Sequence, residues 1–530
     1  MGRQDAADVS YDFVLVGAGS AGASLAARLS EDLDRSVLLL EAGPDYKSPS
    51  EIPPDLLDSR NLAGMAHDWN YSAIPVSGRS MPYRRGRVTG GTSAINAAAA
   101  QWGKPADFAA WVKSGNPEWS WERVLPFFRK LEHDTDGDGQ THGRNGPITI
   151  SRYTYGELVP IQRAFYEACR ERGFADVRDH NAVGVSGVGP WPLNRDGATR
   201  VSTALGYLQA ARKRPNFNVQ PSSMATRVRF DGRCAIGVEL ADGELKRGKN
   251  IVLCAGAIGS PAILLRSGIG PRQHLRDLDI DVLLDMPGVG ARLWDHAAVP
   301  VYMRPRPGQC VPGRDPRFQV VATLTAEGSS EPDDLQMVMT TYVDISASPA
   351  LLAAAEVPVV TALRAALMVP RSHGCLRLTS ADPNVAPRIE LNFAADPEDM
   401  RRLMAATRVA WSLVNTEALK RDTQGIVGLT EEIVRSNHLL RTYILEQIGT
   451  YCHALGTAPM GPEDAPGAVV DQYCRVHGFE NLWIVDASVM PSIPRAVPNL
   501  TVIMLAERVA AWMRAAPNHH ILPTPKSGHR

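Results

Sequence analysis

The sequence predicts a two-domain α/β protein, with a parallel sheet in one domain and helices on an antiparallel sheet in the other. Three observations support this prediction. The length of 530 residues exceeds the roughly 250 to 300 residues at which a single core stops growing. Residues 11–32 begin with a β-prone run, continue through a glycine-rich turn and end in a helical pattern. Later stretches, such as QVVATLTA and LQMVMTTYV, show an alternating pattern. Such a pattern is typical of antiparallel strands with one solvated or ligand-facing side.

Composition and charge exclude several classes of function. The net charge of −1 and the pI near 6.9 predict no nucleic-acid partner and no anionic membrane surface as partner. No stretch approaches the ~20 apolar residues of a membrane span, and the first ten residues carry charges without an apolar core. The seven cysteines are scattered without metal-ligand spacing. We therefore expect a cytoplasmic protein without a metal site.

The glycine-rich turn predicts a Rossmann unit that binds a dinucleotide. Gly17, Gly19 and Gly22 occupy the G-x-G-x-x-G positions, which let the turn close and let the backbone approach a pyrophosphate. A second β-run at residues 36–40 ends at Glu41, where a carboxylate accepts hydrogen bonds from an adenosine ribose. This motif alone does not distinguish FAD from NAD.

Five further segments carry a family resemblance that extends over nearly the whole chain. They are residues 86–100 (GRVTGGTSAINAAAA), 256–271 (GAIGSPAILLRSGIGP), 372–393, 453–461 (HALGTAPMG) and 469–494. Together with the first motif they resemble the glucose–methanol–choline (GMC) family of FAD-dependent oxidoreductases. The resemblance implies FAD as the cofactor, bound non-covalently, because Ile95 stands where some members carry a linking histidine.

The resemblance also implies a set of cofactor contacts. Asp486 to Ser488 correspond to the family's flavin-binding turn, and the Val228 position commonly meets the adenine through its backbone. The expected cofactor-binding residues are Gly17, Gly19, Ser20, Ala21, Gly22, Glu41, Ala42, Trp69, Arg87, Gly90, Gly91, Thr92, Ser93, Asn96, Ala97, Val228, Ala255, Gly256, Asp486, Ala487, Asn499 and Leu500.

The same resemblance implies how the chain divides into domains. A discontinuous FAD-binding Rossmann-like domain is expected from residues 9–155, 200–300 and 446–515. An α+β substrate domain with an antiparallel sheet is expected from residues 156–199 and 301–445, with the helix-like run at residues 397–415 covering one face of that sheet. Residues 516–530 are expected to form a flexible tail.

The family places its catalytic base at a histidine in the closing segment, which is His453 here. An unperturbed imidazole pKa near 6.5 suits this side chain to accept a proton at neutral pH. Tyr451 and Cys452 are expected to line the substrate pocket. Val497 departs from the family, whose members carry Asn or His there, so the usual hydrogen bond to the substrate oxygen is missing.

Asp295 and His296 lie in the segment WDHAAV, which resembles a family stretch but has Arg292 in place of the usual Asn. We interpret these two residues as structural, because a histidine far from the closing motif usually serves packing or hydrogen bonding.

Three functions remain open at this stage. The first is oxidation of a small organic alcohol, primary or aromatic, by hydride transfer to flavin N5 with His453 as base. The second keeps the FAD fold but changes the chemistry to decarboxylation or cyanohydrin cleavage, which the departure at Val497 favours. The third is a non-catalytic flavin-binding protein. The electron acceptor, O2 or another carrier, and the oligomeric state stay open.

Overall fold

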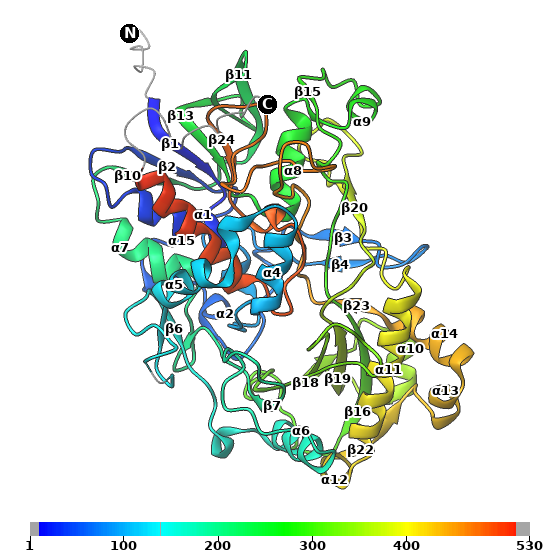
Figure 1. Ribbon diagram of the computed structural model, residues 1–530. Helices are drawn as coiled ribbons and strands as arrows, with labels where there is room; N and C mark the ends of the chain where they lie inside the picture. Colours follow the sequence, from blue (N-terminus) through cyan, green and yellow to red (C-terminus); the bar gives the residue numbers. More distant parts are fainter. Residues whose placement is uncertain (1–9, 138, 516–530) are drawn as a thin grey trace.

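Two seven-stranded sheets form the framework of the computed structural model, which describes residues 10–137 and 139–515. Figure 1 places one sheet in the upper half of the molecule and the other in the lower half. The expected flexible tail at residues 516–530 lies outside the described residues. In the described part of the chain, no helix is long and apolar enough to cross a membrane.

The upper sheet contains the predicted Rossmann unit. Parallel pairing joins β10, β2, β1, β13 and β24, and β12 and β11 continue the sheet in antiparallel fashion. The strands are β1 (Ser10–Val16), β2 (Val37–Leu40), β10 (Phe217–Gln220), β11 (Ala225–Asp231), β12 (Cys234–Leu240), β13 (Leu245–Leu253) and β24 (Leu482–Ile484). The last four residues of β1 and all of β2 are buried, as continuous apolar runs in a parallel sheet require.

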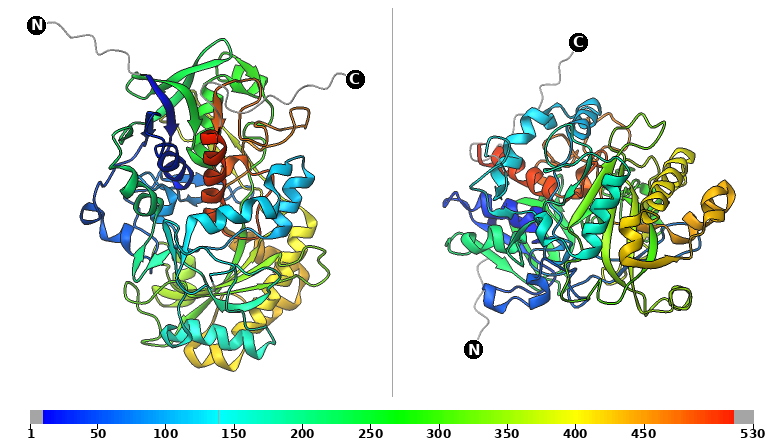
Figure 2. Two further views of the ribbon diagram at one scale, coloured as in Figure 1. Left: turned by 60° about the vertical axis from the view of Figure 1, so that its left-hand side comes forward. Right: turned by 90° about the horizontal axis from the view of Figure 1, so that it is seen from below.

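Two helices from opposite ends of the chain pack side by side on this sheet (Figure 2, left). They are α1 (Ser20–Leu29), which follows the glycine turn, and α15 (Asn499–Ala515). Buried Glu507 of α15 accepts hydrogen bonds from Arg28 Nε at 2.8 Å and from Tyr207 Oη at 2.8 Å. The middle of α15 is thereby held beside the last turn of α1.

The lower sheet is antiparallel throughout, which confirms the predicted second sheet. Its strands are β7 (Gly187–Pro190), β16 (Ala297–Pro305), β17 (Val320–Leu324), β18 (Leu335–Asp344), β19 (Val359–Leu367), β22 (Thr423–Val427) and β23 (Gly449–Thr450). The predicted helix is α11 (Pro397–Val414), which packs on β16, β18 and β19. The opposite face of the sheet is left for the site.

The remaining elements complete the fold. The other helices are α2 (Pro54–Leu57), α3 (Thr92–Ile95), α4 (Pro105–Lys113), α5 (Trp121–Leu131), α6 (Pro160–Glu171), α7 (Gln209–Ala211), α8 (Gly256–Arg266), α9 (Arg272–Arg276), α10 (Pro349–Ala355), α12 (Glu417–Asp422), α13 (Glu431–Arg435) and α14 (Asn437–Gln447). The other strands are β3 (Tyr71–Ala73), β4 (Met81–Tyr83), β5 (Glu132–Asp134), β6 (Ile148–Ile150), β8 (Arg195–Asp196), β9 (Thr199–Arg200), β14 (Ile269–Gly270), β15 (Leu284–Asp285), β20 (Cys375–Arg377) and β21 (Arg388–Glu390). Short 3-10 or π turns are η1 (Pro49–Glu51), η2 (Pro117–Trp119), η3 (Tyr155–Glu157), η4 (Ala204–Leu208) and η5 (Ala487–Val489).

The expected division of the chain into two domains stays a prediction, and the lower sheet differs from its bounds at two places. Strand β16 begins at Ala297, before the expected boundary at residue 301, and β23 belongs to the lower sheet although it lies in the segment 446–515. Both differences arise because β16 and β23 pair directly, Ala297 with Thr450 and Ala298 with Gly449. The lower sheet therefore reaches up to the segment that contains His453.

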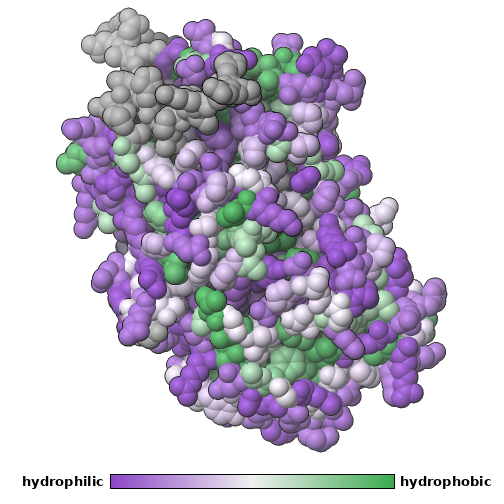
Figure 3. Space-filling view, viewed as in Figure 1, coloured by the Kyte–Doolittle hydropathy of each residue, from purple (hydrophilic) through white to green (hydrophobic). Residues whose placement is uncertain are grey.

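The face seen in Figure 3 is largely hydrophilic, and its hydrophobic side chains are most numerous over the lower half. Most apolar residues of both sheets lie inside, in one large cluster of buried side chains. Burial of this apolar surface is the main favourable contribution to folding.

Candidate active site

A cavity of about 1240 Å³ lies between the two sheets. One end, which we call the motif end, is lined by the first glycine motif, residues of the segment 86–97 and the turn at Asp486. The other, the sheet end, is lined by residues of the lower sheet and by Tyr451, Cys452 and His453. The volume exceeds the ~300 to 1,000 Å³ typical of small-molecule pockets. The cavity can therefore hold an extended cofactor and a second small molecule.

The glycine turn after β1 is held tightly at the motif end. Gly17 adopts φ of +100°, and a Cβ there would lie 2.7 Å from the carbonyl oxygen of Cys254. Glu41 supports the same turn, because its carboxylate accepts from the amides of Ala18 at 2.9 Å and Gly43 at 2.8 Å. Burial raises the pKa of Glu41 to about 7, while these backbone bonds favour the charged form.

The segment around α3 packs directly on the first motif. A Cβ at Gly91, whose φ is +52°, would lie 2.6 Å from Gly19 Cα. Glycine at position 91 permits this approach of the two backbones, whereas a Cβ at Gly19 would lie at an ordinary 3.7 Å from Gly91 Cα. Asn499 closes the same corner, since its Oδ1 accepts from Ser20 Oγ at 2.8 Å. Three segments that are distant in sequence thus meet at one end of the cavity.

The turn at Asp486 forms another wall of the motif end. Its carboxylate accepts from the Gly256 amide at 2.8 Å and from the hydroxyls of Ser260 at 2.5 Å and Ser488 at 2.6 Å. These bonds attach the turn to the start of α8. A Cβ at Gly256 would meet no atom within 4 Å, so open space remains beside this backbone.

Most of the expected cofactor residues line this cavity. Those that do not are Gly22, Gly90, Ser93, Val228 and Leu500. Val228 is buried in β11 and its amide donates to Ser267 Oγ at 2.8 Å. Ser222 to Ala225 line the cavity near that strand instead.

His453 is held at the cavity wall by Asp295. Oδ1 of Asp295 accepts the His453 amide at 2.8 Å, and Oδ2 accepts from Tyr83 Oη at 2.8 Å and from the Thr450 hydroxyl. Cys452, immediately before His453, adopts φ of +61°, which is uncommon for a residue with a side chain. The chain thus turns sharply from β23 to present the imidazole to the cavity.

His296 contacts the imidazole of His453 itself. The Nδ1 atoms of the two residues lie 2.8 Å apart, and Nε2 of His296 lies 3.1 Å from the carbonyl oxygen of Met368 and 3.0 Å from that of Pro494. Because carbonyl oxygens only accept, the hydrogen-bond network assigns the proton of His296 to Nε2. Nδ1 of His296 then accepts, and Nδ1 of His453 donates.

This network leaves Nε2 of His453 unprotonated. Burial lowers the pKa of His296 to about 4, although its two carbonyl partners favour the charged form. Burial, together with the neighbouring His296 and Arg85, holds the pKa of His453 well below its usual range. Both imidazoles are therefore neutral at pH 7. We interpreted Asp295 and His296 as structural residues, and both hold His453 in place. Asp295 binds its backbone amide, and His296 binds its imidazole.

The sheet end also contains polar residues that the sequence analysis did not single out. Val338 of β18 pairs with Arg364 of β19, so both side chains lie on one sheet face, and Thr340 follows at the next position on that face. All three line the cavity, as do Arg317, Phe318 and Trp191. An arginine within the apolar strand Val359–Leu367 was the one available sequence signal.

Val497 lines the cavity and is buried, so its apolar side chain does face the site. The cavity wall is therefore apolar at this position, where a polar group was expected from the family. Tyr451 also lines the cavity, packs against Ala298 and Ala366 of the lower sheet, and has its ring centroid 5.6 Å from that of His453.

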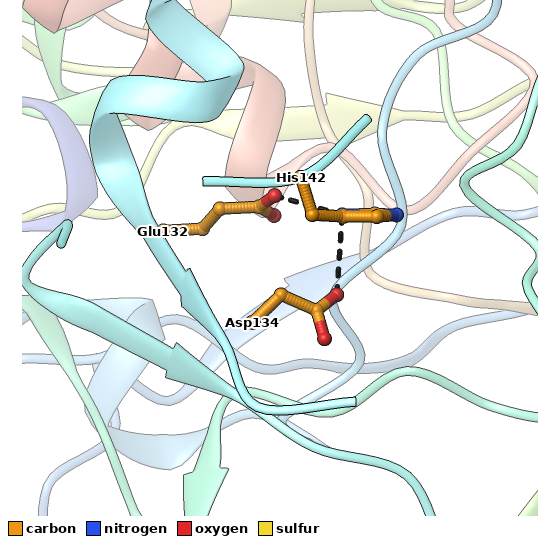
Figure 4. Close-up of side chains that lie close together, drawn as sticks. All are labelled: Glu132, Asp134 and His142. Carbon is orange, nitrogen blue, oxygen red and sulfur yellow. Dashed lines mark hydrogen bonds and ion pairs between the residues drawn. The ribbon is translucent and has the colours of Figure 1, made fainter. Parts of the chain in front are cut away.

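A second polar cluster, Glu132, Asp134 and His142, lies outside the cavity lining (Figure 4). His142 Nδ1 lies 2.8 Å from Glu132 and 3.1 Å from Asp134, and its Nε2 lies 2.9 Å from Asp179. Burial alone would lower the pKa of His142, but the hydrogen bonds to Asp179 and Glu132 raise it to about 10. Both ring nitrogens therefore donate to carboxylates, as in an ion-pair network and unlike a metal ligand.

The residues of the motif end fit FAD. Glu41 has the position of a ribose acceptor, and the side-chain-free backbones of Gly19 and Gly256 border open space, as close approach of a pyrophosphate and a ring system requires. The turn at Asp486 and Asn499 would complete the cofactor site. Ile95, at the position of the linking histidine in some GMC proteins, lines the same cavity and has no nucleophile.

Comparison with known proteins gives the same assignment. Two family models described as GMC oxidoreductase match residues 11–298 and 370–506. The 5-(hydroxymethyl)furfural oxidase of Methylovorus sp. (strain MP688) is 34% identical, over 95% of this chain and 98% of the relative. An oxygen-dependent choline dehydrogenase of Serratia proteamaculans (strain 568) is 33% identical, over 96% of each chain.

A solved structure agrees at the level of the whole fold. The crystal structure of pyridoxine 4-oxidase from Mesorbium loti superposes with a TM-score of 0.88 and 29% identity, over 96% of this chain and all of that chain. The family models together span more than half of the sequence, and the matched residues include the motif end of the cavity and Tyr451, Cys452 and His453. The chain therefore belongs to the GMC oxidoreductase family and is an FAD-dependent oxidoreductase of CH–OH donors.

Proposed function

We propose that this protein oxidises the primary alcohol group of a small, ring-containing molecule to the carbonyl, with His453 as the general base. The observation that carries the proposal is the proton arrangement of the histidine pair. Nδ1 of His453 donates to His296, so its free Nε2 is the proton acceptor at the cavity. A neutral imidazole with an available nitrogen is what abstraction of a hydroxyl proton needs.

The chemistry that FAD supplies when bound is acceptance of a hydride from the carbinol carbon. The residues of the chain handle the proton. His453 Nε2 takes it from the hydroxyl, while Nδ1–H stays bonded to His296 and the backbone stays bonded to Asp295. Because these contacts exist beforehand, the base does not need to reorient during the reaction.

Two observations support a ring-containing substrate. Trp191 and Phe318 line the sheet end, with ring centroids 5.9 Å apart in an edge-to-face arrangement. The apolar side chain of Val497 forms a wall that suits a flat hydrophobic substrate. A hydrogen-bonding side chain at this position would suit such a substrate less well. Relatives named for 5-(hydroxymethyl)furfural and pyridoxine also act on ring compounds.

Anaerobic mixing of the purified holoenzyme with a panel of alcohols tests this function. Bleaching of the flavin absorbance by primary ring alcohols supports alcohol oxidation. Product formation without net flavin reduction would instead support decarboxylation or cyanohydrin cleavage, and no reaction across the panel would support a flavin-binding protein without activity. Admitting O2 or an artificial acceptor to the reduced enzyme then identifies which acceptor restores the absorbance.

A further inference from the structure

Two arginines face the sheet end of the cavity without a carboxylate partner. Arg364 projects from the middle of β19, and Arg317 lies just before β17. Neither forms an ion pair with any residue in the described part of the chain. Burial lowers the pKa of Arg317, and the nearby Arg364 lowers it further. Arginine stays protonated in proteins, so two positive charges lie close together here.

The same region contains further donors without partners. Nε of Arg364, Oη of Tyr451, Oγ1 of Thr340 and Nε1 of Trp191 are buried and make no hydrogen bond. Thr340 is 1% exposed and Trp191 is 4% exposed, so solvent at the surface does not satisfy them. Unpaired buried polar groups are unfavourable by themselves, and such a set around a cavity indicates a polar ligand.

The acidic residues of the cavity are engaged elsewhere. Glu41 binds two backbone amides, Asp486 binds Gly256 and two serines, and Asp68 pairs with Arg84 at 3.0 Å. Asp242, the other acid of the lining, accepts from the Glu244 amide at 3.0 Å in a turn after β12 of the upper sheet. The sheet end therefore has an excess of positive charge.

We propose that the substrate is a hydroxy acid, whose carboxylate binds Arg317 and Arg364 while its hydroxyl lies at His453. This inference rests on the proposed alcohol oxidation and adds the anionic group. A planar guanidinium binds a carboxylate through two parallel hydrogen bonds, and Tyr451, Thr340 and Trp191 supply further donors.

Tyr451 sets the distance between the two ends of this substrate. Its ring stands edge-on to that of His453, with centroids 5.6 Å apart. Burial raises the pKa of its phenol group, and the nearby Arg364 lowers it. Tyr451 thus neighbours both the base and Arg364. A substrate with the carboxylate across a ring from the hydroxymethyl group fits this arrangement.

The test uses two alcohols of one shape, 4-(hydroxymethyl)benzoate and 4-(hydroxymethyl)benzamide. The parent holoenzyme is expected to show a kcat/KM for the benzoate at least about tenfold above that for the benzamide, because charge-assisted bonds are about twice as strong as neutral ones. In Arg364→Gln and Arg317→Gln this ratio should fall toward one. Equal kcat/KM for both alcohols in the parent enzyme, or an unchanged ratio in both variants, would overturn the proposal.

A matched control is Arg304→Gln. Arg304 lies on β16 of the same sheet, but it pairs with Glu356 at 3.2 Å and does not line the cavity. Its replacement should leave the benzoate preference unchanged. Arg364→Lys keeps the charge but loses the planar fork, so its ratio should lie between those of the parent and Arg364→Gln. Flavin absorbance of each purified variant reports whether it has folded.

Benzoate, which has no hydroxyl group, separates this inference from the proposed function. It should perturb the flavin spectrum of the parent holoenzyme with a Kd at least about tenfold lower than that of benzamide. Arg364→Gln should remove this difference. Benzoate binding that depends on Arg364, without oxidation of any alcohol, would sustain the anion site and contradict the proposed function. Equal binding of benzoate and benzamide would contradict the anion site alone.

Discussion

The Nδ1 atoms of His296 and His453 lie 2.8 Å apart, and this contact determines which nitrogen of His453 is available as a base. The two backbone carbonyls at Nε2 of His296 set the direction of the whole chain of hydrogen bonds. His296 thereby acts through His453 as a positioning residue.

Replacing His296 tests this positioning. His296→Leu removes the acceptor and leaves Nδ1–H of His453 unpaired, so the tautomer with a proton on Nε2 gains population. We expect kcat to fall by roughly tenfold, because the free energy of one hydrogen bond corresponds to about this factor in rate. KM should change little. His296→Asn, whose Oδ1 can accept, should recover part of the loss. Equal rates in the two variants would contradict the tautomer argument.

The pH dependence of the reaction reports on the same imidazole. Burial and the nearby His296 and Arg85 hold the pKa of His453 below its usual range. The base is active when neutral, so activity is lost only as the pH falls through this lowered pKa. We expect the acidic limb of kcat/KM for a neutral alcohol to lie below pH 6.5, the usual value for histidine. An acidic limb at or above pH 6.5 would contradict this environment.

The cofactor should be released by acid. Ile95 lines the cavity at the position of the linking histidine in some GMC proteins, and it has no nucleophilic atom. We expect yellow FAD in the supernatant after acid precipitation and a colourless pellet. Flavin retained in the precipitated protein would contradict non-covalent binding and direct attention to another residue of the cavity.

The ion-pair network around His142 predicts a pH-dependent stability. The pKa of His142 in the folded protein, about 10, is above the usual 6.5. The contribution of His142 to the free energy of unfolding is therefore fully present below pH 6.5. It is lost as the pH rises toward 10, at up to about 1.4 kcal/mol per pH unit.

The measurement compares urea unfolding midpoints of the parent and His142→Gln at pH 6.5 and pH 9. The variant should be clearly less stable at pH 6.5 and closer to the parent at pH 9. A constant difference between the two proteins would show that His142 is not charged in the folded state.

Local sequence signals predicted much of the fold. The expected strand at residues 11–16 is β1 (Ser10–Val16), and the expected helix at residues 397–415 is α11 (Pro397–Val414). Both depend on short-range patterns, namely an apolar run before a glycine turn and a 3.6-residue period. Short-range patterns do not place the start of β16 at Ala297, since this strand pairs with β23, more than 140 residues away in the chain.

The expected cofactor and catalytic residues came from motifs, whereas the support around them depends on distant contacts. His296 reaches His453 across 157 positions. Ala362 and Ala366 lie two positions on either side of Arg364 in β19, so the sequence shows that the three share a face, but which face meets the cavity depends on packing of the whole sheet. Val228 matched a family position, yet its amide is bound to Ser267.

The most direct test of the account is the rate of anaerobic flavin reduction by a primary ring alcohol in the parent enzyme and in His453→Ala. The residues proposed to bind FAD at the motif end are untouched, so the variant should purify with its flavin. We predict that its flavin is reduced roughly 10² to 10⁴ times more slowly, the usual contribution of a positioned general base. A His453→Ala enzyme that reduces its flavin at the parent rate would contradict the assignment of His453 as the base.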